Sequence, residues 1–186
     1  MEVLQLVKKA KRGNKEALLQ LIIDEKDDYY KLAFTYMGNK HDAMDAMEEM
    51  ILSLYEKIHQ LKKEEAFQSW SKTILVNSCK TMLRKRKKLV LIDDWNNQIE
   101  KEHNQHNDAL ASDPYINSER QMDIQQLLLH VNQYQKEAIQ LKYFHDMDYQ
   151  TIADITNVSI GTVKSRIFQG LKKLKDQYGG DSDEKH

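Results

Sequence analysis

Apolar residues recur at helical spacing along the first ninety positions of the chain, with turn-forming residues between the runs. Gly-Asn pairs at positions 13–14 and 38–39 are predicted to end the first and third helices. Asp42 is predicted to cap a fourth helix, whose apolar face comprises Ala43, Met47, Ile51, Leu54 and Ile58. A fifth helix is expected from about position 66 into position 84. Five helices joined by such short loops predict a compact bundle.

Near the C-terminus the pattern predicts two amphipathic helices joined by a tight turn, which together form a helix-turn-helix. Asp148 can cap the first helix, the pair at 157–158 turns the chain, and Ser159 is positioned to cap the second helix. The inward positions are Ile152, Ala153 and Ile155 in the first helix and Val163, Ile167, Leu171 and Leu174 in the second. At 100° per residue, the four positions of the second helix lie within an arc of about 80°.

The opposite face of this second helix is polar and carries one aromatic ring. Its members are Lys164, Ser165, Phe168, Gln169 and Lys172. Lysines suit phosphate oxygens, and Ser and Gln can donate to and accept from base edges. Phe168 has no place in the predicted core and suits a thymine methyl group. The face therefore predicts readout of duplex DNA, and the alternative is a solvated lysine face on an ordinary terminal helix.

A second candidate surface lies on the fifth predicted helix, which runs into a basic segment. Residues 80–88 carry a net charge of +6, and the turns before and within this segment present Trp70, Asn77, Thr81 and Arg84. Aromatic, amide and cationic groups on one helix can hold a strand backbone and stack or hydrogen-bond unpaired bases. The alternatives are that Trp70 belongs to the core, that Asn77 bonds a neighbouring carbonyl, and that the basic run is merely solvated.

The composition changes between these two blocks. Residues 93–114 carry a net charge of −5, four Asn and little apolar material, which is typical of a solvated connector. Gly and Pro together number only 7 of 186 residues, about a third of the usual share. We therefore predict an all-α protein with two small helical domains, residues 1–91 and 118–178, joined by a flexible acidic linker over 92–117. Residues 179–186 are expected to form a disordered tail.

Charge and composition also exclude several classes of protein. With 28 Lys plus Arg against 29 Asp plus Glu, the whole chain selects no partner by net charge. No 18-residue apolar run and no signal-peptide pattern is visible, so we expect no membrane insertion and a cytoplasmic protein. No phosphate-cradling Gly loop, H-E-x-x-H or nucleophile elbow is present, so we expect neither catalysis nor a cofactor. His103 and His106 offer metal ligands, but in a flexible connector we expect no metal site.

The chain resembles a short sigma-70 factor of the extracytoplasmic-function group over nearly its whole length. FQSWSKTILVNSCKTMLRKRKK (residues 67–88) resembles the helix that ends the promoter-melting domain, region 2 of the family. VSIGTVKSRIF (residues 158–168) is the most specific piece of the −35-reading helix-turn-helix, region 4. The resemblance implies a transcription-initiation subunit that works on core RNA polymerase and promoter DNA. It also implies an anti-sigma factor as a further partner.

The resemblance further implies which residues act. An acidic helix would dock on the polymerase through Asp45, Glu48 and Glu49. The −10 element would be engaged by Trp70, Asn77, Lys80, Thr81, Arg84 and Lys85. The −35 element would be read by Ser159, Thr162, Lys164, Ser165, Arg166, Phe168, Gln169 and Lys172, with Thr162, Arg166 and Lys172 as phosphate contacts.

Two other readings of the basic helices exist. A conventional helix-turn-helix regulator would bind duplex DNA alone, usually as a dimer with paired half-sites, but the chain has no coiled-coil heptads and the first block would be unexplained. An RNA-binding regulator would use the same helices, but its usual aromatic signatures are absent. The single cysteine, Cys79, lies where a small buried residue is expected, and redox sensing is the alternative reading for it.

Overall fold

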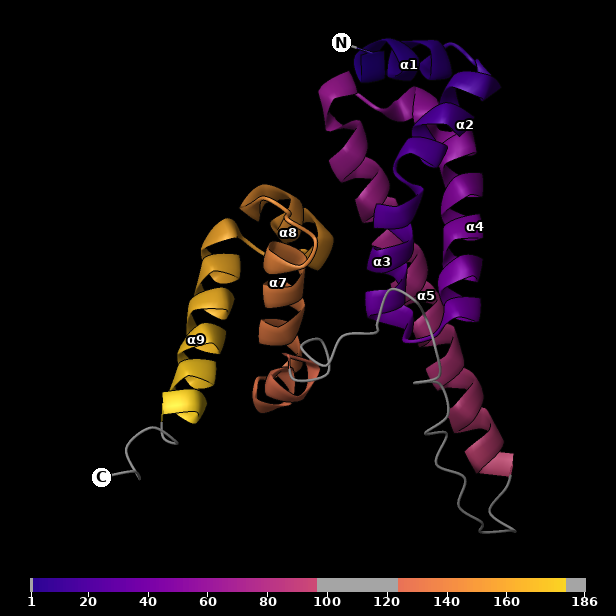
Figure 1. Cartoon of the computed structure of the whole chain (residues 1–186). Helices are drawn as coiled ribbons and strands as arrows, with labels where there is room; N and C mark the ends of the chain where they lie inside the picture. Colours follow the sequence, from indigo (N-terminus) through magenta and orange to yellow (C-terminus); the bar gives the residue numbers. More distant parts are fainter. Residues whose placement is uncertain (1, 97–123, 180–186) are drawn as a thin grey trace. The chain divides into compact units, whose positions relative to one another are not determined.

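The structure, a computed structural model, describes residues 2–96 and 124–179 and divides into two compact units (Figure 1). The described residues form helices and turns and contain no strand, which confirms the predicted all-α class. Most of the predicted linker, the start of the predicted second domain and the tail from residue 180 lie outside the described residues.

The first unit is a helical bundle. Its elements are α1 (Glu2–Lys11), α2 (Lys15–Asp24), α3 (Lys26–Met37), α4 (Lys40–Lys57), the 3-10 turns η1 (Ile58–Gln60) and η2 (Glu64–Ala66), and α5 (Phe67–Asn96). The helices α3, α4 and α5 pack on one another, and α1 packs on α2 (Figure 1). The core between them is fully buried at Tyr29, Leu32, Met50, Leu54 and Leu75.

The helix ends in this unit follow the Gly-Asn pairs. Gly38 ends α3 with a left-handed φ of 77°, and its N–H donates to the Phe34 carbonyl, which is a conformation that glycine adopts at little cost. Asn39 then caps α4 by accepting a 2.9 Å hydrogen bond from the Asp42 N–H. The prediction that Asp42 is the cap was wrong, because Asn39 lies one turn earlier, directly after the glycine that stops α3.

The fifth helix is much longer than predicted. It begins at Phe67, close to the expected start, but continues through Asn96 rather than ending near position 84. Lys and Arg are good helix formers, so the basic run extends the helix instead of ending it. Residues 93–96, the first part of the acidic connector, therefore belong to α5.

The second unit holds the helix-turn-helix. Residues 124–127 are helical and lead into η3 (Leu128–His130), α7 (Gln133–Tyr143), α8 (Tyr149–Thr156) and α9 (Ile160–Gly179). Helix α9 packs on both α7 and α8. The core contains the predicted inward residues of α8 and two from α9, and these are Ile152, Ala153, Ile155, Val163 and Ile167.

One predicted core position of α9 is wrong. Leu171 is 39% exposed, whereas Gly170 is buried against α7. A Cβ atom at Gly170 would lie 2.7 Å from Ile139 Cδ1 and 3.1 Å from Gln135 Cβ. The absence of a side chain at Gly170 therefore lets α7 and α9 approach closely, and the inward face of α9 includes Gly170 rather than Leu171.

Candidate nucleic-acid interface

The start of α9 is fixed by local hydrogen bonds that the sequence predicts. Asn157 ends α8 in the left-handed conformation, with φ 55°. Ser159 Oγ then accepts a 3.2 Å hydrogen bond from the Thr162 N–H and lies 2.9 Å from Thr162 Oγ1. These bonds place Ser159 and Thr162 at the exposed N-terminal end of the helix, where backbone N–H groups suit an anion.

The outward face of α9 has the composition that the sequence predicts. The exposed members are Lys164, Ser165, Phe168, Gln169 and Lys172. Phe168 is 70% exposed, so its ring contributes to no core. The ring is therefore accessible, between two lysines, to a partner that lies against this face.

Two tyrosines support the basic residues at the edges of this face. The Lys164 Nζ atom lies 5.3 Å from the centre of the Tyr149 ring, and the Arg166 Cζ atom lies 4.8 Å from the centre of the Tyr134 ring. Arg166 is half-buried, so this predicted phosphate contact already has an aromatic partner. The sequence pattern indicates neither tyrosine as part of this face, because each lies far from its cation along the chain.

The α5 residues predicted to meet the −10 element differ in exposure. Trp70 is half-buried, with its ring 6.5 Å from that of Phe67 at the start of the helix. Lys80 is half-buried with its Nζ atom 5.9 Å from the centre of the Tyr36 ring. The Thr81 hydroxyl accepts a 3.1 Å hydrogen bond from Arg84. The exposed members are Asn77, Arg84 and Lys85.

One cation of the basic run is already paired within the protein. Arg86 Nη1 donates a 2.6 Å hydrogen bond to Asp42 Oδ2, and Nη2 donates to Oδ1. The Arg86 guanidinium, assisted by Asn39, holds the pKa of the Asp42 carboxyl below its ordinary value, although burial acts in the opposite direction. Arg86 therefore joins α5 to α4.

The acidic residues predicted to bind polymerase lie on α4. Glu48 and Glu49 are exposed, whereas Asp45 is half-buried with Oδ2 3.7 Å from His41 Nε2. Apolar side chains are exposed on the same helix, and Met44 is 46% and Leu52 62% exposed. The helix thus exposes both carboxylates and apolar groups.

The described residues contain one grouping of potential metal ligands. Atoms of His41, Asp42 and Asp45 lie within 4.8 Å of one another, but both Asp42 oxygens accept hydrogen bonds from Arg86. That carboxylate serves an ion pair rather than a cation site. His103 and His106 lie outside the described residues.

Comparison with known proteins identifies the family. The family model "Sigma-70 region 2" matches residues 21–89, and "Sigma-70, region 4" matches residues 121–174. The chain is 31% identical over 169 residues to the RNA polymerase sigma factor SigV of Bacillus subtilis. This match covers 91% of this chain and 95% of that protein. The chain belongs to the extracytoplasmic-function group of the sigma-70 family.

Other relatives agree with this assignment. The extracytoplasmic-function sigma factor SigW of Bacillus subtilis is 28% identical over 186 residues, covering 95% of this chain and 97% of that protein. Two solved structures share the fold. CnrH in complex with the cytosolic domain of CnrY has a TM-score of 0.67, 17% identity and coverage of 98% of this chain and 100% of that chain. RpoE of Bartonella quintana, in complex with the anti-sigma factor NepR, has a TM-score of 0.64 and 22% identity. The match covers 88% of this chain and 96% of that chain.

Each of the two family regions falls within one of the two units of this sigma factor. Region 2 covers the end of α2, all of α3 and α4 and most of α5, and region 4 covers α7, α8 and most of α9. A sigma factor is a subunit for transcription initiation and not an enzyme, so the prediction of no catalysis is confirmed. Among the described residues, no helix combines the length and apolar character needed to cross a bilayer.

Proposed function

We propose that this sigma factor directs RNA polymerase to promoters through three surfaces, one for the polymerase and two for promoter DNA. The acidic face of α4 binds core RNA polymerase, α5 holds the opened −10 element, and α9 reads the −35 element as duplex. The proposal keeps the domain limits predicted from the sequence, 1–91 and 118–178. The observation that carries it is the exposed face of α9, where Phe168 lies between Lys164 and Lys172.

The polymerase surface is proposed on the exposed carboxylates of α4. Glu48 and Glu49 are exposed next to apolar groups such as Met44. A partner helix with basic and apolar residues would gain both charge complementarity and apolar burial. Asp45 contributes negative charge at the edge of this surface.

The −10 surface is proposed on the outward side of α5. Asn77, Arg84 and Lys85 are exposed and can reach an unpaired strand. Trp70 is half-buried, and aromatic side chains serve as platforms on which unpaired bases stack. Lys80 and Thr81 are half-buried between these positions, so we assign them contacts with the sugar-phosphate backbone.

The −35 surface is proposed on α9, with the usual geometry of a recognition helix in the major groove. Ser165, Phe168 and Gln169 face the base edges, together with Lys164. Thr162, Arg166 and Lys172 contact phosphates. Ser159 holds the N-terminus of α9 near the sugar-phosphate backbone of the DNA.

An anti-sigma factor is the proposed regulator. The relatives CnrH and RpoE are solved in complex with the cytosolic domain of CnrY and with the anti-sigma factor NepR, respectively. We propose that a protein of this class covers exposed apolar and charged positions of this chain and so prevents polymerase binding.

Charge reversal tests whether the surfaces are separate. A Lys164→Glu/Lys172→Glu variant should bind core polymerase normally but lose promoter-specific run-off transcription. A Glu48→Lys/Glu49→Lys variant should fail to bind core polymerase in a pull-down. The matched control for the Lys164→Glu/Lys172→Glu variant is Lys8→Glu/Lys9→Glu on α1, which makes the same change of charge at exposed positions outside all three surfaces. Loss of both activities in both variants would contradict the proposal.

A further inference from the structure

Two basic side chains of α9 are held against aromatic rings that come from other elements. Tyr134 lies in the first turn of α7 and Tyr149 is the first residue of α8. Their ring centres lie 4.8 Å from Arg166 Cζ and 5.3 Å from Lys164 Nζ, respectively, within the range of about 6 Å in which a cation is attracted to a ring face. Lys164 and Arg166 are two residues apart, about 200° around the helix, so the two rings support opposite sides of α9.

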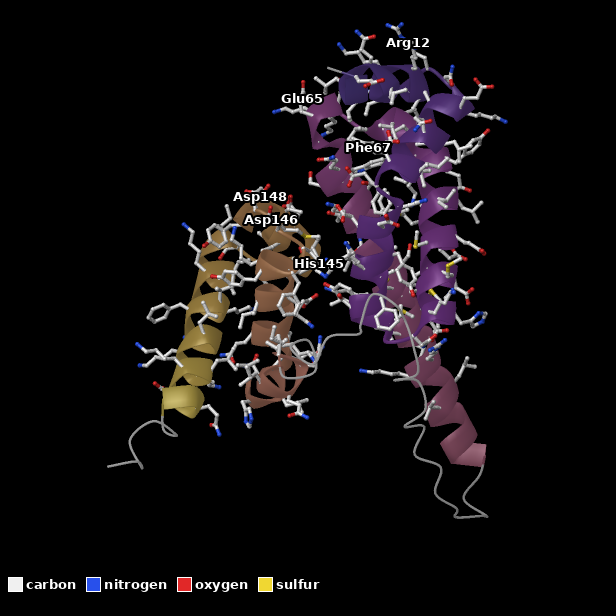
Figure 2. All side chains as sticks on the ribbon, viewed as in Figure 1. Arg12, Glu65, Phe67, His145, Asp146 and Asp148 are labelled. Carbon is white, nitrogen blue, oxygen red and sulfur yellow. The ribbon has the colours of Figure 1, made fainter. Side chains whose placement is uncertain are left out.

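The Tyr149 ring is itself fixed by its neighbours. Asp148 caps α8 by accepting a 2.7 Å hydrogen bond from the Thr151 N–H, and this segment forms the α7–α8 connection in Figure 2. The Lys142 Nζ atom lies 4.8 Å from the centre of the same ring and donates a 3.3 Å hydrogen bond to the Met147 carbonyl. A second cation thus ties the ring to α7.

The backbone at Tyr134 is fixed by the cap of α7. Asn132 accepts a 2.9 Å hydrogen bond from the Gln135 N–H, and the Gln135 side chain accepts a 3.2 Å hydrogen bond from the Asn132 N–H. Tyr134 lies between these two residues, so its backbone position is set. Its side chain is 62% exposed, which is more than a ring that serves the core requires.

We propose that Tyr134 and Tyr149 are positioning residues for DNA binding. They hold Arg166 and Lys164 in place beside the duplex before it arrives. Long basic side chains lose rotamer freedom when they are immobilised at an interface, and side chains already ordered on a ring lose less. The inference rests on the proposed role of α9 in reading the −35 duplex.

The test separates the position of a cation from its charge. Holoenzyme is assembled from core polymerase and the full chain, and its affinity is measured between 50 and 200 mM salt. The probe is a duplex that carries only the −35 element of a promoter found by run-off transcription. Tyr134→Leu and Tyr149→Leu should each weaken binding about threefold to tenfold. Neither substitution should change the salt slope, which is the slope of the logarithm of the binding constant against the logarithm of the salt concentration. Arg166→Gln, which removes the charge of a proposed phosphate contact, should instead lower the magnitude of that slope by about 0.9.

Conservative variants provide the rescue. Tyr134→Phe and Tyr149→Phe keep the ring face and should restore binding to within about twofold. Tyr143→Leu, at another exposed tyrosine of α7, is the matched control and should bind like the original chain. Because Tyr134 is mostly exposed, Tyr134→Leu carries the test alone if Tyr149→Leu does not fold. Leu variants that bind normally, Phe variants that bind as weakly as Leu variants, or a reduced slope in the Leu variants would overturn the inference.

The variants that remove a charge report on the proposed function itself. If Arg166→Gln and Lys172→Gln leave the salt slope unchanged, α9 makes no phosphate contacts and the proposed function of α9 is wrong. If they lower the slope while the tyrosine variants bind normally, only the positioning role is wrong.

Discussion

Arg86, in the basic half of α5, forms a two-point ion pair with Asp42 in the first turn of α4. The Asp42 side chain is 6% exposed and the Arg86 side chain 51% exposed, so one partner is buried and the other still reaches water. Planar guanidinium and carboxylate groups fit one another in this geometry. The pair therefore fixes the proposed DNA-binding helix of region 2 against the helix proposed to bind polymerase.

Replacement of Asp42 by Asn should destabilise the first unit in a pH-dependent way. Because the folded state lowers the pKa of Asp42, the carboxylate stabilises the fold above its ordinary value of 3.8, and this stabilisation is lost as the pH falls through the lowered pKa. We expect Asp42→Asn to reduce the free energy of unfolding by about 1–3 kcal/mol at pH 7. The difference from the original chain should narrow below about pH 4.

Urea unfolding followed by tryptophan fluorescence measures this effect, because both tryptophans belong to α5. A double-mutant cycle with Arg86→Ala is the control, since the second substitution should cost much less once Asp42 has been replaced. A difference that stays constant between pH 7 and pH 3.5 would show that the charge of Asp42 is not responsible.

Addition of one methyl group at Gly170 should destabilise the second unit. A Cβ atom there would lie 2.7 Å from Ile139 Cδ1 and 3.1 Å from Gln135 Cβ, and both neighbours are buried. We expect Gly170→Ala to cost about 1–3 kcal/mol through overpacking, although alanine favours helix by about 1 kcal/mol over glycine. Hydrogen exchange of the α7 and α9 amides measures this loss.

Gly161 provides the matched control on the same helix. A Cβ atom there would meet only Ser159 Oγ, at 3.8 Å. Gly161→Ala should therefore slow exchange or leave it unchanged. Equal effects of the two substitutions would show that the contact between α7 and α9 is not tight at Gly170.

Local signals in the sequence predicted the helix-turn-helix correctly. Asp148 and Ser159 are caps whose bonds reach only three residues along the chain. Asn157 adopts the left-handed turn that its side chain tolerates. Such features depend on neighbours in sequence, so the sequence alone is sufficient to find them.

Features set by distant contacts could not be predicted in this way. Asn39 and Asp42 are both residue types that cap helices. Which of them caps α4 depends on where Gly38 ends the preceding helix. It also depends on Arg86, which lies 44 positions after Asp42 and binds its carboxylate. The exposure of Leu171 follows from the close approach of α7 at Gly170. A periodic pattern places both α9 residues near the same face, and only the neighbouring helix decides which is buried.

Cys79 should resist thiol reagents in the folded protein. Its side chain is fully buried, and burial raises its pKa to about 12, against about 8.5 for an exposed thiol. At pH 8 the population of the reactive thiolate is then about three orders of magnitude lower. Labelling with a chromogenic disulfide should be slow in buffer and fast in denaturant, and it reports on one site because the chain has a single cysteine. Stoichiometric labelling of the native protein within minutes would favour redox sensing.

Removal of the Phe168 ring should reduce promoter discrimination without affecting the fold. The ring is 70% exposed, so Phe168→Ala deletes no core contact, and one apolar contact with a base is worth about 1 kcal/mol, or about fivefold in affinity. We expect run-off transcription from the best promoter to fall about fivefold relative to promoters altered in the −35 element. The log–log salt slope should stay unchanged, because no phosphate contact is lost. Leu129→Ala, at a residue of the same unit that is 74% exposed, is the matched control and should transcribe normally. An unchanged preference among −35 sequences in the Phe168→Ala variant would show that this ring does not face the bases.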